Sequence, residues 1–322
     1  MAQTILITGA KGYLGGRLVV ALADDSALIL IGTTRNVPTA PPGWPQSSRL
    51  VRLDPLLQDR HELEAALQGV DMVVHLSAPN EVVSANDPGE ALVATGLASL
   101  KLLVAAKSAG CRRFVYLSTI HVYGTPLQGR ISEIDLPRPL HPYAIAHRAA
   151  EDYVLAAQAR REIEGVVLRL SNGIGAPAWP TVDRWTLIGN EFCRQAIREG
   201  RIALHTTGLQ WRDFILLRDF TAALRHVIGL PAAALGDGLF NLGGRLPLRI
   251  IDVAEIVGQR AREMFGKDIA ITRAPAATDE SWPEIDYSIE RIAATGFVPS
   301  PRAALDAEID ATLAVCRAAT IR

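Results

Sequence analysis

Short apolar runs alternate with amphipathic stretches along the first half of the chain. Six runs are apolar at consecutive positions, as is typical of strands covered on both faces: Thr4–Ile7, Leu28–Gly32, Leu50–Leu53, Met72–Leu76, Phe114–Leu117 and Val166–Leu170. Between them, apolar residues recur at spacings of three and four, which predicts helices over Leu14–Ala23, His61–Leu67, Glu90–Ala109 and Tyr143–Ala159. This alternation indicates β-α-β units that feed a parallel sheet.

The regular alternation ends near Ser171. Proline and tryptophan crowd the next segment, which is typical of a loop, and the later helices and strands are expected to be short and irregularly spaced. We therefore predict an α/β protein with a Rossmann-type doubly wound parallel sheet over residues 1–170. A smaller α/β lobe over residues 171–322 is expected to interleave with this core and to form a cleft with it.

Composition excludes several kinds of partner. The chain has 322 residues, of which 49% are hydrophobic, and its mean hydropathy of +0.17 fits a folded globular protein. The 33 basic and 34 acidic residues give a net charge of −1, so no broad basic field would attract nucleic acid or an anionic membrane. Without a run of 18 apolar residues or a signal-type start, a cytoplasmic protein is expected.

Neither cysteine nor histidine is arranged as metal sites require. The three cysteines, Cys111, Cys193 and Cys316, are odd in number and far apart, which disfavours a disulfide framework and fits a reducing compartment. The spacing of the histidines likewise indicates no metal site.

A glycine-rich turn follows the first strand. The segment Thr8 to Gly15 places glycine at positions 9, 12 and 15, and a helix is predicted to begin at once. Such glycines allow a tight turn, close approach of the backbone to a pyrophosphate, and close packing of helix on strand. The spacing therefore predicts that the first domain binds a dinucleotide through Gly9, Gly12, Tyr13, Leu14 and Gly15, although three glycines can also mark a simple turn.

The end of the second strand indicates which dinucleotide is bound. An acidic residue there would accept hydrogen bonds from an unphosphorylated ribose, but the strand ends in Gly32, Thr33, Thr34 and Arg35. Thr33 and Arg35 could bind a 2′-phosphate, so NADP is favoured and NAD stays possible. Arg35 could instead be a solvated loop cation. Asp54 could accept from the adenine amine or simply cap a turn beside Pro55.

Two further motifs are consistent with the glycine loop. Ser118 to Gly124 follows the fifth predicted strand, and Pro142 to His147 opens the fourth predicted helix. Together with the glycine loop, they resemble the extended short-chain dehydrogenase/reductase superfamily, in its NAD(P)-dependent epimerase/dehydratase group that acts on nucleotide sugars. The resemblance covers nearly the whole chain and includes His75–Ala78, Arg169–Gly175, Arg212–Phe214 and Phe240–Gly243. It implies cofactor contacts at Leu76, Ser77 and Ala78.

The resemblance also implies the catalytic residues. Thr119 would hold the substrate oxygen, and Tyr143 would give or take its proton during hydride transfer. The family has a lysine four residues after the tyrosine, on the same helix face, whereas this chain has His147. Imidazole is largely neutral near pH 7 and supplies no permanent charge, although it could still donate to the nicotinamide ribose. Either a protonated His147 and the oxidised cofactor maintain tyrosinate, or the chemistry is weakened.

Two other departures bear on the reaction. Dehydratases of the family place Asp and Glu after the threonine, where this chain has Ile120 and His121, so water elimination is disfavoured. Thr95 lies near the position of an asparagine in the family. What remains is a 4-keto-reductase, which is slightly favoured by an NADP-type site, or a 4-epimerase. A non-catalytic dinucleotide-binding protein is the alternative from another class.

The resemblance extends to the substrate and to assembly. It places Thr119, His121, Asn172 and Arg212 at a nucleotide-sugar substrate, with the Arg212 guanidinium suited to a diphosphate. An ion pair between Arg212 and Asp213 is the alternative role for that side chain. The helices Glu90–Ala109 and Tyr143–Ala159 correspond to those that form a dimer interface in relatives, so a homodimer is expected.

Overall fold

The computed structural model describes residues 2–275 and 281–320. The chain divides into two compact units. Unit 1 comprises residues 1–125, 133–170 and 224–241, and unit 2 comprises residues 126–132, 171–223 and 242–322. Each unit is therefore built from segments that are distant in the sequence.

A seven-stranded sheet forms the centre of unit 1. Its order is β11-β7-β5-β4-β1-β2-β3, in which the six strands from β7 to β3 pair in parallel. The strands are β1 (Gln3–Thr8), β2 (Leu28–Thr34), β3 (Ser48–Arg52), β4 (Met72–His75), β5 (Arg113–Thr119), β7 (Glu164–Leu170) and β11 (Leu239–Leu242). The order reverses beside β1, so the topology is the doubly wound one expected from the apolar runs.

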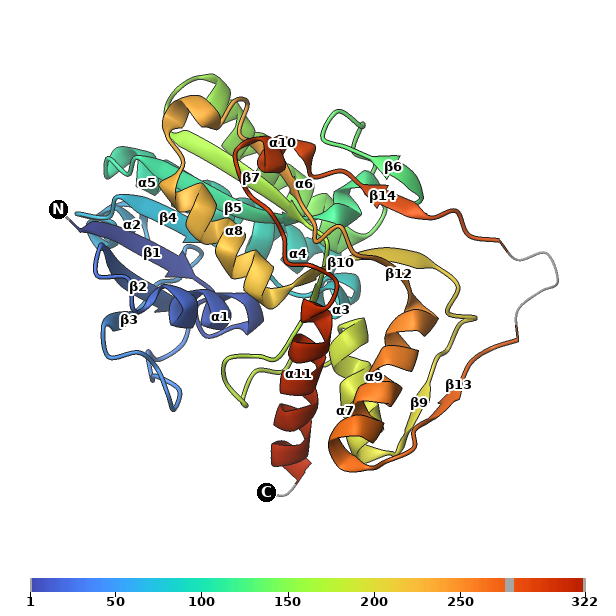
Figure 1. Ribbon diagram of the computed structural model, residues 1–322. Coiled ribbons are helices and arrows are strands. Elements are labelled where there is room, and N and C mark those ends of the chain that lie inside the picture. The colour runs from blue at the N-terminus through green and yellow to red at the C-terminus, as the bar shows by residue number, and fades with distance from the viewer. Residues whose placement is uncertain (1, 276–280, 321–322) are drawn as a thin grey trace. The chain divides into compact units, whose positions relative to one another are not determined.

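Helices cover the sheet of unit 1 because its strands are apolar on both faces. One face is covered by α2 (Arg60–Ala66), α5 (Ala98–Ser108) and α6 (Pro142–Ala159), whose apolar side chains form a common core with the strands. Figure 1 shows α1 (Tyr13–Leu22) on the opposite face of the same sheet. A capping box formed by Asp59 and Glu62 begins α2, and Gly110, at φ +81°, follows the end of α5.

The predicted helix Glu90–Ala109 contains a π-helical segment. It begins as α4 (Pro88–Ala91), continues as the π-helix η1 (Leu92–Leu97) and ends as α5, and α3 (Glu81–Asn86) precedes it. The stretch Pro88–Ser108 is long and apolar enough to cross a membrane, but 56% of its most apolar window is buried inside the protein. That burial is typical of a core helix, and the helix packs against α6 and α2.

Unit 2 contains three small sheets. The first has the order β12-β10-β8, built from β8 (Asn172–Ile174), β10 (Trp211–Leu216) and β12 (Pro247–Arg249). The other two sheets are parallel pairs of strands: β9 (Arg201–Ala203) with β13 (Ala270–Thr272), and β6 (Gly129–Ile131) with β14 (Ile285–Tyr287). Pairing of β6 with β14 explains why residues 126–132 belong to this unit although they lie early in the chain.

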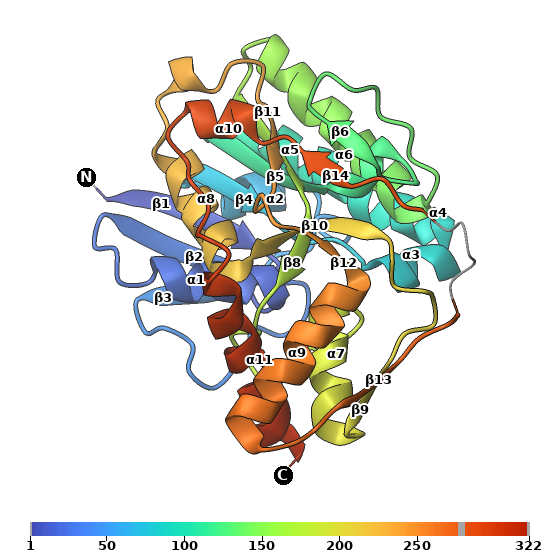
Figure 2. The same ribbon diagram turned by 45° about the vertical axis from the view of Figure 1, so that its right-hand side comes forward.

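The helices of the second half are longer than the sequence analysis expected. They include α7 (Ile188–Arg198), α9 (Ile250–Phe265) and α11 (Ala304–Thr320), which share one hydrophobic core and lie side by side in Figures 1 and 2. The expectation of short elements was wrong for these three helices, whereas most strands of this half have only three residues, as expected. The remaining elements are η2 (Ile120–Tyr123), α8 (Leu217–Gly229), η3 (Ala232–Ala234) and α10 (Glu290–Ala294).

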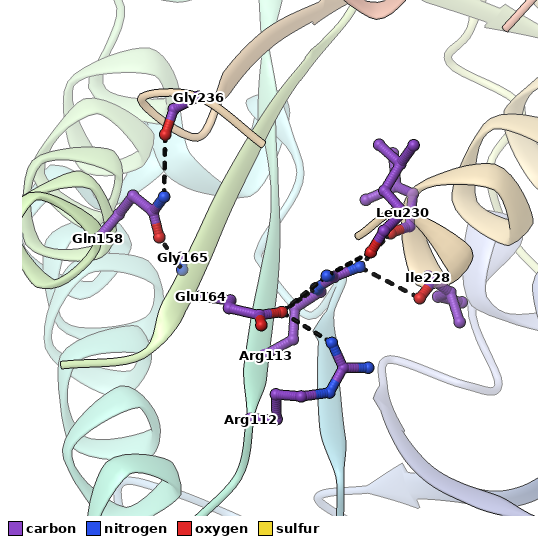
Figure 3. Close-up of polar contacts among 9 residues, drawn as sticks. Arg112, Arg113, Gln158, Glu164, Gly165, Ile228, Leu230 and Gly236 are labelled. Atoms are coloured by element: carbon purple, nitrogen blue, oxygen red, sulfur yellow. Dashed lines mark hydrogen bonds and ion pairs between the residues drawn. The ribbon is translucent and has the colours of Figure 1, made fainter. Parts of the chain in front are cut away.

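A buried arginine ties the amino-terminal edge of the sheet to the end of α8. Arg113, at the start of β5, is completely buried and donates to the carbonyl oxygens of Val227, Ile228 and Leu230 at 2.5–3.1 Å. Its guanidinium also pairs with Glu164 at 2.7 Å (Figure 3). These carbonyls lie at or just beyond the end of α8, where few backbone donors remain, so the buried cation caps that helix while its charge is neutralised.

Replacing this arginine should destabilise unit 1. In Arg113→Met, three carbonyls lose this donor and the Glu164 carboxylate keeps only Arg112, so the free energy of unfolding should fall by about 3–5 kcal/mol. The matched control is Arg112→Met, since Arg112 pairs with the same carboxylate at 2.8 Å but is 41% exposed, and should cost less than about 1 kcal/mol. Urea unfolding followed by circular dichroism measures both, and equal losses would contradict the assigned role.

Candidate functional site

The glycine loop between β1 and α1 has the shape of a phosphate-binding turn. Gly9 adopts a φ of +65°, and its carbonyl accepts the Gly12 amide at 2.8 Å. A Cβ on Gly15 would lie 2.2 Å from the Gly9 oxygen, so helix and loop approach too closely for a side chain. The first turn of α1 has no acidic residue and no side-chain cap. The loop thus fits a dinucleotide phosphate, with backbone amides and a positive helix end.

A buried chain of polar side chains joins this loop to the end of β4. The Thr8 hydroxyl accepts the amides of Leu76 and Ser77 at 3.0 and 3.1 Å and lies 2.7 Å from Nδ1 of His75. The His75 Nε2 lies 2.9 Å from the Ser99 hydroxyl. Leu76 and Ser77 are therefore held beside the glycine loop, and contact of Leu76, Ser77 and Ala78 with a cofactor stays a prediction.

The directions of these bonds follow from one carbonyl. The Ser99 hydroxyl donates to the Thr95 oxygen at 2.5 Å, so towards His75 it can only accept. His75 Nε2 therefore carries the hydrogen, and Nδ1 accepts from Thr8. Burial lowers the pKa of His75 to about 4, so the ring is neutral. The Thr95 backbone and Ser99 thus supply hydrogen bonds at the position where the family has asparagine.

The end of β2 carries no carboxylate, and an indole fills the adjoining space. A Cβ on Gly32 would lie 2.6 Å from the Trp44 ring and 2.8 Å from the Ala10 Cβ. Trp44, from the loop between β2 and β3, thus lies against the end of β2. Thr33 is buried at 2% exposure, and Arg35 is exposed.

Asp54 caps a turn. Its Oδ1 accepts the Leu56 amide at 3.0 Å, and its backbone carbonyl accepts the amides of Leu57 and Gln58. This arrangement matches the alternative that the sequence left open for an aspartate beside a proline. Contact between Asp54 and adenine stays a prediction.

Thr119 lies at the carboxyl end of β5 and begins η2. Its hydroxyl oxygen accepts the His121 amide at 3.2 Å, which leaves the hydroxyl hydrogen available to a substrate oxygen. The side chain is buried at 5% exposure, whereas His121 is exposed. The next residue, Ile120, is also buried and apolar, so this position supplies no acid or base.

Tyr143 and His147 lie on one face of α6, where His141 and Pro142 precede Tyr143. The His141 Nδ1 accepts the Tyr143 amide at 3.2 Å, which caps the helix. The two rings meet edge to face with centroids 4.4 Å apart. Their contact follows from the four-residue spacing that the sequence showed.

The environment of His147 bears on the first of the two alternatives, in which a protonated ring maintains tyrosinate. The side chain is 3% exposed, and its Nδ1 lies 2.8 Å from the Tyr116 hydroxyl, from β5. Burial, assisted by the neighbouring His75 and His121, lowers the pKa of His147 to about 3. Burial therefore favours the neutral imidazole and disfavours a protonated His147 that maintains tyrosinate at neutral pH.

A second buried cluster braces the motif segments. Arg169 on β7 forms a bidentate ion pair with Glu151 of α6 at 2.8–3.3 Å, and its guanidinium lies 4.7 Å above the Tyr123 ring. The Tyr123 hydroxyl donates to Asn241 at 2.7 Å, and Glu133 accepts the Asn241 amide at 2.8 Å. The cluster joins β7, α6, η2 and β11, so it fixes the segment that carries Thr119.

The remaining two substrate candidates lie in unit 2. The Asn172 amide donates to the Asp213 carbonyl at 2.9 Å. Arg212 is partly buried and donates to the Trp211 carbonyl at 2.9 Å; within the described ranges it forms no ion pair with Asp213. Asp213 instead accepts the amides of Gly244 and Leu246, and burial raises its pKa to about 6. The Arg212 guanidinium thus keeps its charge for a ligand.

Sequence reasoning missed Tyr116 and Ser99. Ser99 was included in an apolar helix and Tyr116 in an apolar strand, although polar atoms in both elements signalled buried hydrogen bonds.

In residues 2–275 and 281–320, no group of three His, Cys, Asp or Glu side chains could hold a metal ion.

The chain matches the model of the NAD dependent epimerase/dehydratase family over residues 5–243. It therefore belongs to this family of NAD-dependent enzymes, and the resemblance to the extended short-chain dehydrogenase/reductase superfamily is confirmed.

Curated and solved relatives support the same class. The chain is 26% identical over 302 residues to dTDP-D-glucose 4,6-dehydratase of Mus musculus, covering 90% of this chain and 79% of the relative. It is 28% identical over 318 residues to UDP-glucose 4-epimerase of Azospirillum brasilense, covering 92% and 87%. The structure of MoeE5 with UDP-glucose and NAD matches with a TM-score of 0.77 at 26% identity, covering 98% of this chain and 99% of the other.

The free energy of unfolding should depend on pH through His75. An unfolded histidine has a pKa of about 6.5. The folded value of about 4 means that the unfolded chain binds more protons between these values. Stability from neutral His75 is therefore complete above pH 6.5 and is lost as pH falls, by about 2 kcal/mol from pH 7 to pH 5.

Urea unfolding at pH 7 and pH 5 tests this dependence. His75→Gln should remove this component of about 2 kcal/mol. His61→Gln should keep it, because His61 is 94% exposed. Asp213 acts in the opposite direction, since its pKa is raised, but it is present in every variant and cancels. The same pH dependence in wild type and His75→Gln would show that His75 is not a buried neutral group.

Proposed function

We propose that this protein is a nucleotide-sugar 4-keto-reductase that uses NADP(H). The observation that carries the choice of reaction is the neutral, buried His147 at the position of the family's lysine. The nucleotide-sugar substrate is supported by the family and by the relatives, whose names refer to dTDP-glucose and UDP-glucose. The positive Arg212 would suit the diphosphate of such a substrate.

Ketone reduction needs a proton donor at the carbonyl oxygen. Bound reduced nicotinamide supplies the hydride. Tyr143 gives its phenolic proton to the oxygen, and the Thr119 hydroxyl donates a hydrogen bond to the same atom. Both groups act as donors, so both are needed in their protonated forms.

His147 favours this direction over the first step of an epimerase. Oxidation of a sugar hydroxyl requires tyrosinate as base, which a neighbouring cation stabilises. The uncharged His147 supplies no such charge and leaves Tyr143 in its phenol form. Elimination of water is further disfavoured because Ile120 is buried and apolar where a dehydratase would need an acid.

The assay uses NADPH and a panel of nucleotide 4-keto-sugars, and follows NADPH absorbance. Wild type should oxidise NADPH with at least one of them. Tyr143→Phe should lower kcat by about 10²–10⁴ and leave NADPH affinity nearly unchanged. Tyr153→Phe is the matched control, because Tyr153 lies on the same helix but is 48% exposed.

Other outcomes identify the alternatives. Interconversion of UDP-sugars with tightly retained NAD would replace the reductase by a 4-epimerase. Binding of NADPH without turnover on any sugar would indicate a non-catalytic dinucleotide-binding protein. Activity retained in Tyr143→Phe would contradict the assignment of the proton donor.

The preference for NADP rests on the end of β2. Gly32 places no carboxylate there, Trp44 fills the space beside it, and Arg35 is exposed and forms no ion pair in the described part of the chain. A guanidinium attracts a 2′-phosphate, and nothing on this strand end repels one. The solved relative named above contains NAD, so the preference is a property of this strand end rather than of the family.

Cofactor titrations separate the two dinucleotides. Wild type should bind NADPH at least about tenfold more tightly than NADH, and Arg35→Ala should weaken NADPH binding about tenfold without affecting NADH. Arg49→Ala, an exposed arginine on neighbouring β3, is the control and should change neither. Equal affinities in wild type would exclude the NADP preference.

We also propose a homodimer. Six aliphatic side chains on α3, η1 and α6 are 38–50% exposed: Val82, Val83, Leu92, Val93, Leu97 and Ile145. Exposed aliphatic groups on adjacent helices are typical of an association surface. Light scattering on the assay sample measures the molar mass, and a monomer would exclude this assembly.

A further inference from the structure

Tyr116 has a buried hydroxyl whose geometry fixes its partner. The residue is 1% exposed in β5, and its oxygen lies 2.8 Å from His147 Nδ1. Burial raises the pKa of Tyr116 well above its usual value, so the hydroxyl keeps its hydrogen. A buried hydroxyl must donate that hydrogen to some acceptor, because an unsatisfied donor costs free energy.

Among the residues that the structure describes, Ser99 is the competing acceptor near the Tyr116 hydroxyl. Its hydroxyl acts on the pKa of Tyr116, yet the two groups form no bond of ordinary hydrogen-bond geometry among the described residues. The Ser99 hydroxyl already donates a hydrogen bond to the Thr95 carbonyl and accepts one from His75 Nε2. Tyr116 therefore donates to His147 Nδ1, and in the neutral imidazole the hydrogen must be on Nε2.

The Nε2–H group of His147 is the donor that this arrangement leaves without a partner among the described residues. It is buried and has no hydrogen-bond partner within the described ranges, and the centroids of the His147 and Tyr143 rings lie 4.4 Å apart. A buried donor without a partner is rare in folded proteins and points to an acceptor oxygen supplied by a ligand.

We propose that Tyr116 is a positioning residue that fixes His147 as an uncharged Nε2–H donor beside Tyr143, and that this pair adapts the site to ketone reduction. The inference rests on the proposed function for its catalytic part only. A lysine at residue 147 would present a cation with several donors, whereas the fixed imidazole presents one directed donor and no charge.

The groups that surround His147 preserve this state. They are Tyr116 from β5, His75 from β4, His121 from η2 and Tyr143 from its own helix. The histidines disfavour a charge on His147, and no carboxylate of the described residues is among the groups that shift its pKa. The ring should therefore stay neutral in one tautomer throughout the neutral range.

Nitrogen NMR of the cofactor-free protein, labelled in histidine, tests the tautomer directly. In wild type, His147 should show a protonated Nε2 and an unprotonated Nδ1, unchanged from pH 5 to pH 8. Tyr116→Phe should populate both tautomers, and Tyr153→Phe should match wild type. A protonated Nδ1, or titration of His147 in this range, would overturn the inference.

Kinetics test the catalytic part. Tyr116→Phe should lower kcat for keto-sugar reduction about tenfold, with KM nearly unchanged and with normal thermal unfolding. If Tyr116→Phe does not fold, His147→Lys tests the same role. The lysine should move the alkaline fall in the reductive rate at least about one pH unit lower, because a cation stabilises tyrosinate.

The outcomes separate the two proposals. Should wild type reduce no keto-sugar, the proposed function fails while the NMR result still decides the tautomer. If wild type is a reductase, two results would contradict the positioning role of Tyr116 and leave the proposed function intact. They are a full kcat in Tyr116→Phe and a faster His147→Lys at every pH.

Discussion

Desolvation of two imidazoles beneath the carboxyl edge of the sheet is the constraint on which the site depends. His75 and His147 are buried without a carboxylate partner, so both rings are neutral and each nitrogen has one possible role. Serine and tyrosine hydroxyls fix which nitrogen carries the hydrogen. Bonds of definite direction consequently join the glycine loop to the end of β4 and to Ser99, and a separate bond joins β5 to the tyrosine helix α6.

Buried charges in unit 1 occur where they are compensated. Arg113 is surrounded by carbonyls and Glu164 at the opposite edge of the sheet, and Arg169 pairs with Glu151 beneath the motif loop. Such charges are stable in an interior only with partners of this quality. Next to Tyr143 the chain instead places an uncharged ring, and this contrast underlies the proposal that the phenol donates a proton rather than accepts one.

The two ends of the dinucleotide site are built by different means. The phosphate end depends on backbone geometry, since the φ of Gly9 and the contact of Gly15 with Gly9 leave no room for side chains. The ribose end depends on a side chain from a loop, because Trp44 fills the space above Gly32. In this chain the proposed cofactor preference therefore depends on a strand end that a loop side chain shapes.

The sequence by itself determined the parallel sheet, the glycine loop, and the shared helix face of Tyr143 and His147, since apolar runs and spacings of three or four residues are local properties. It did not determine that His147 is buried against Tyr116, 31 residues away, or that Trp44 lies on Gly32. It also underestimated α9 and α11, whose apolar faces meet only in the folded core. Tertiary structure decided these features, because burial and hydrogen-bond partners arise from contacts between segments that local patterns cannot pair.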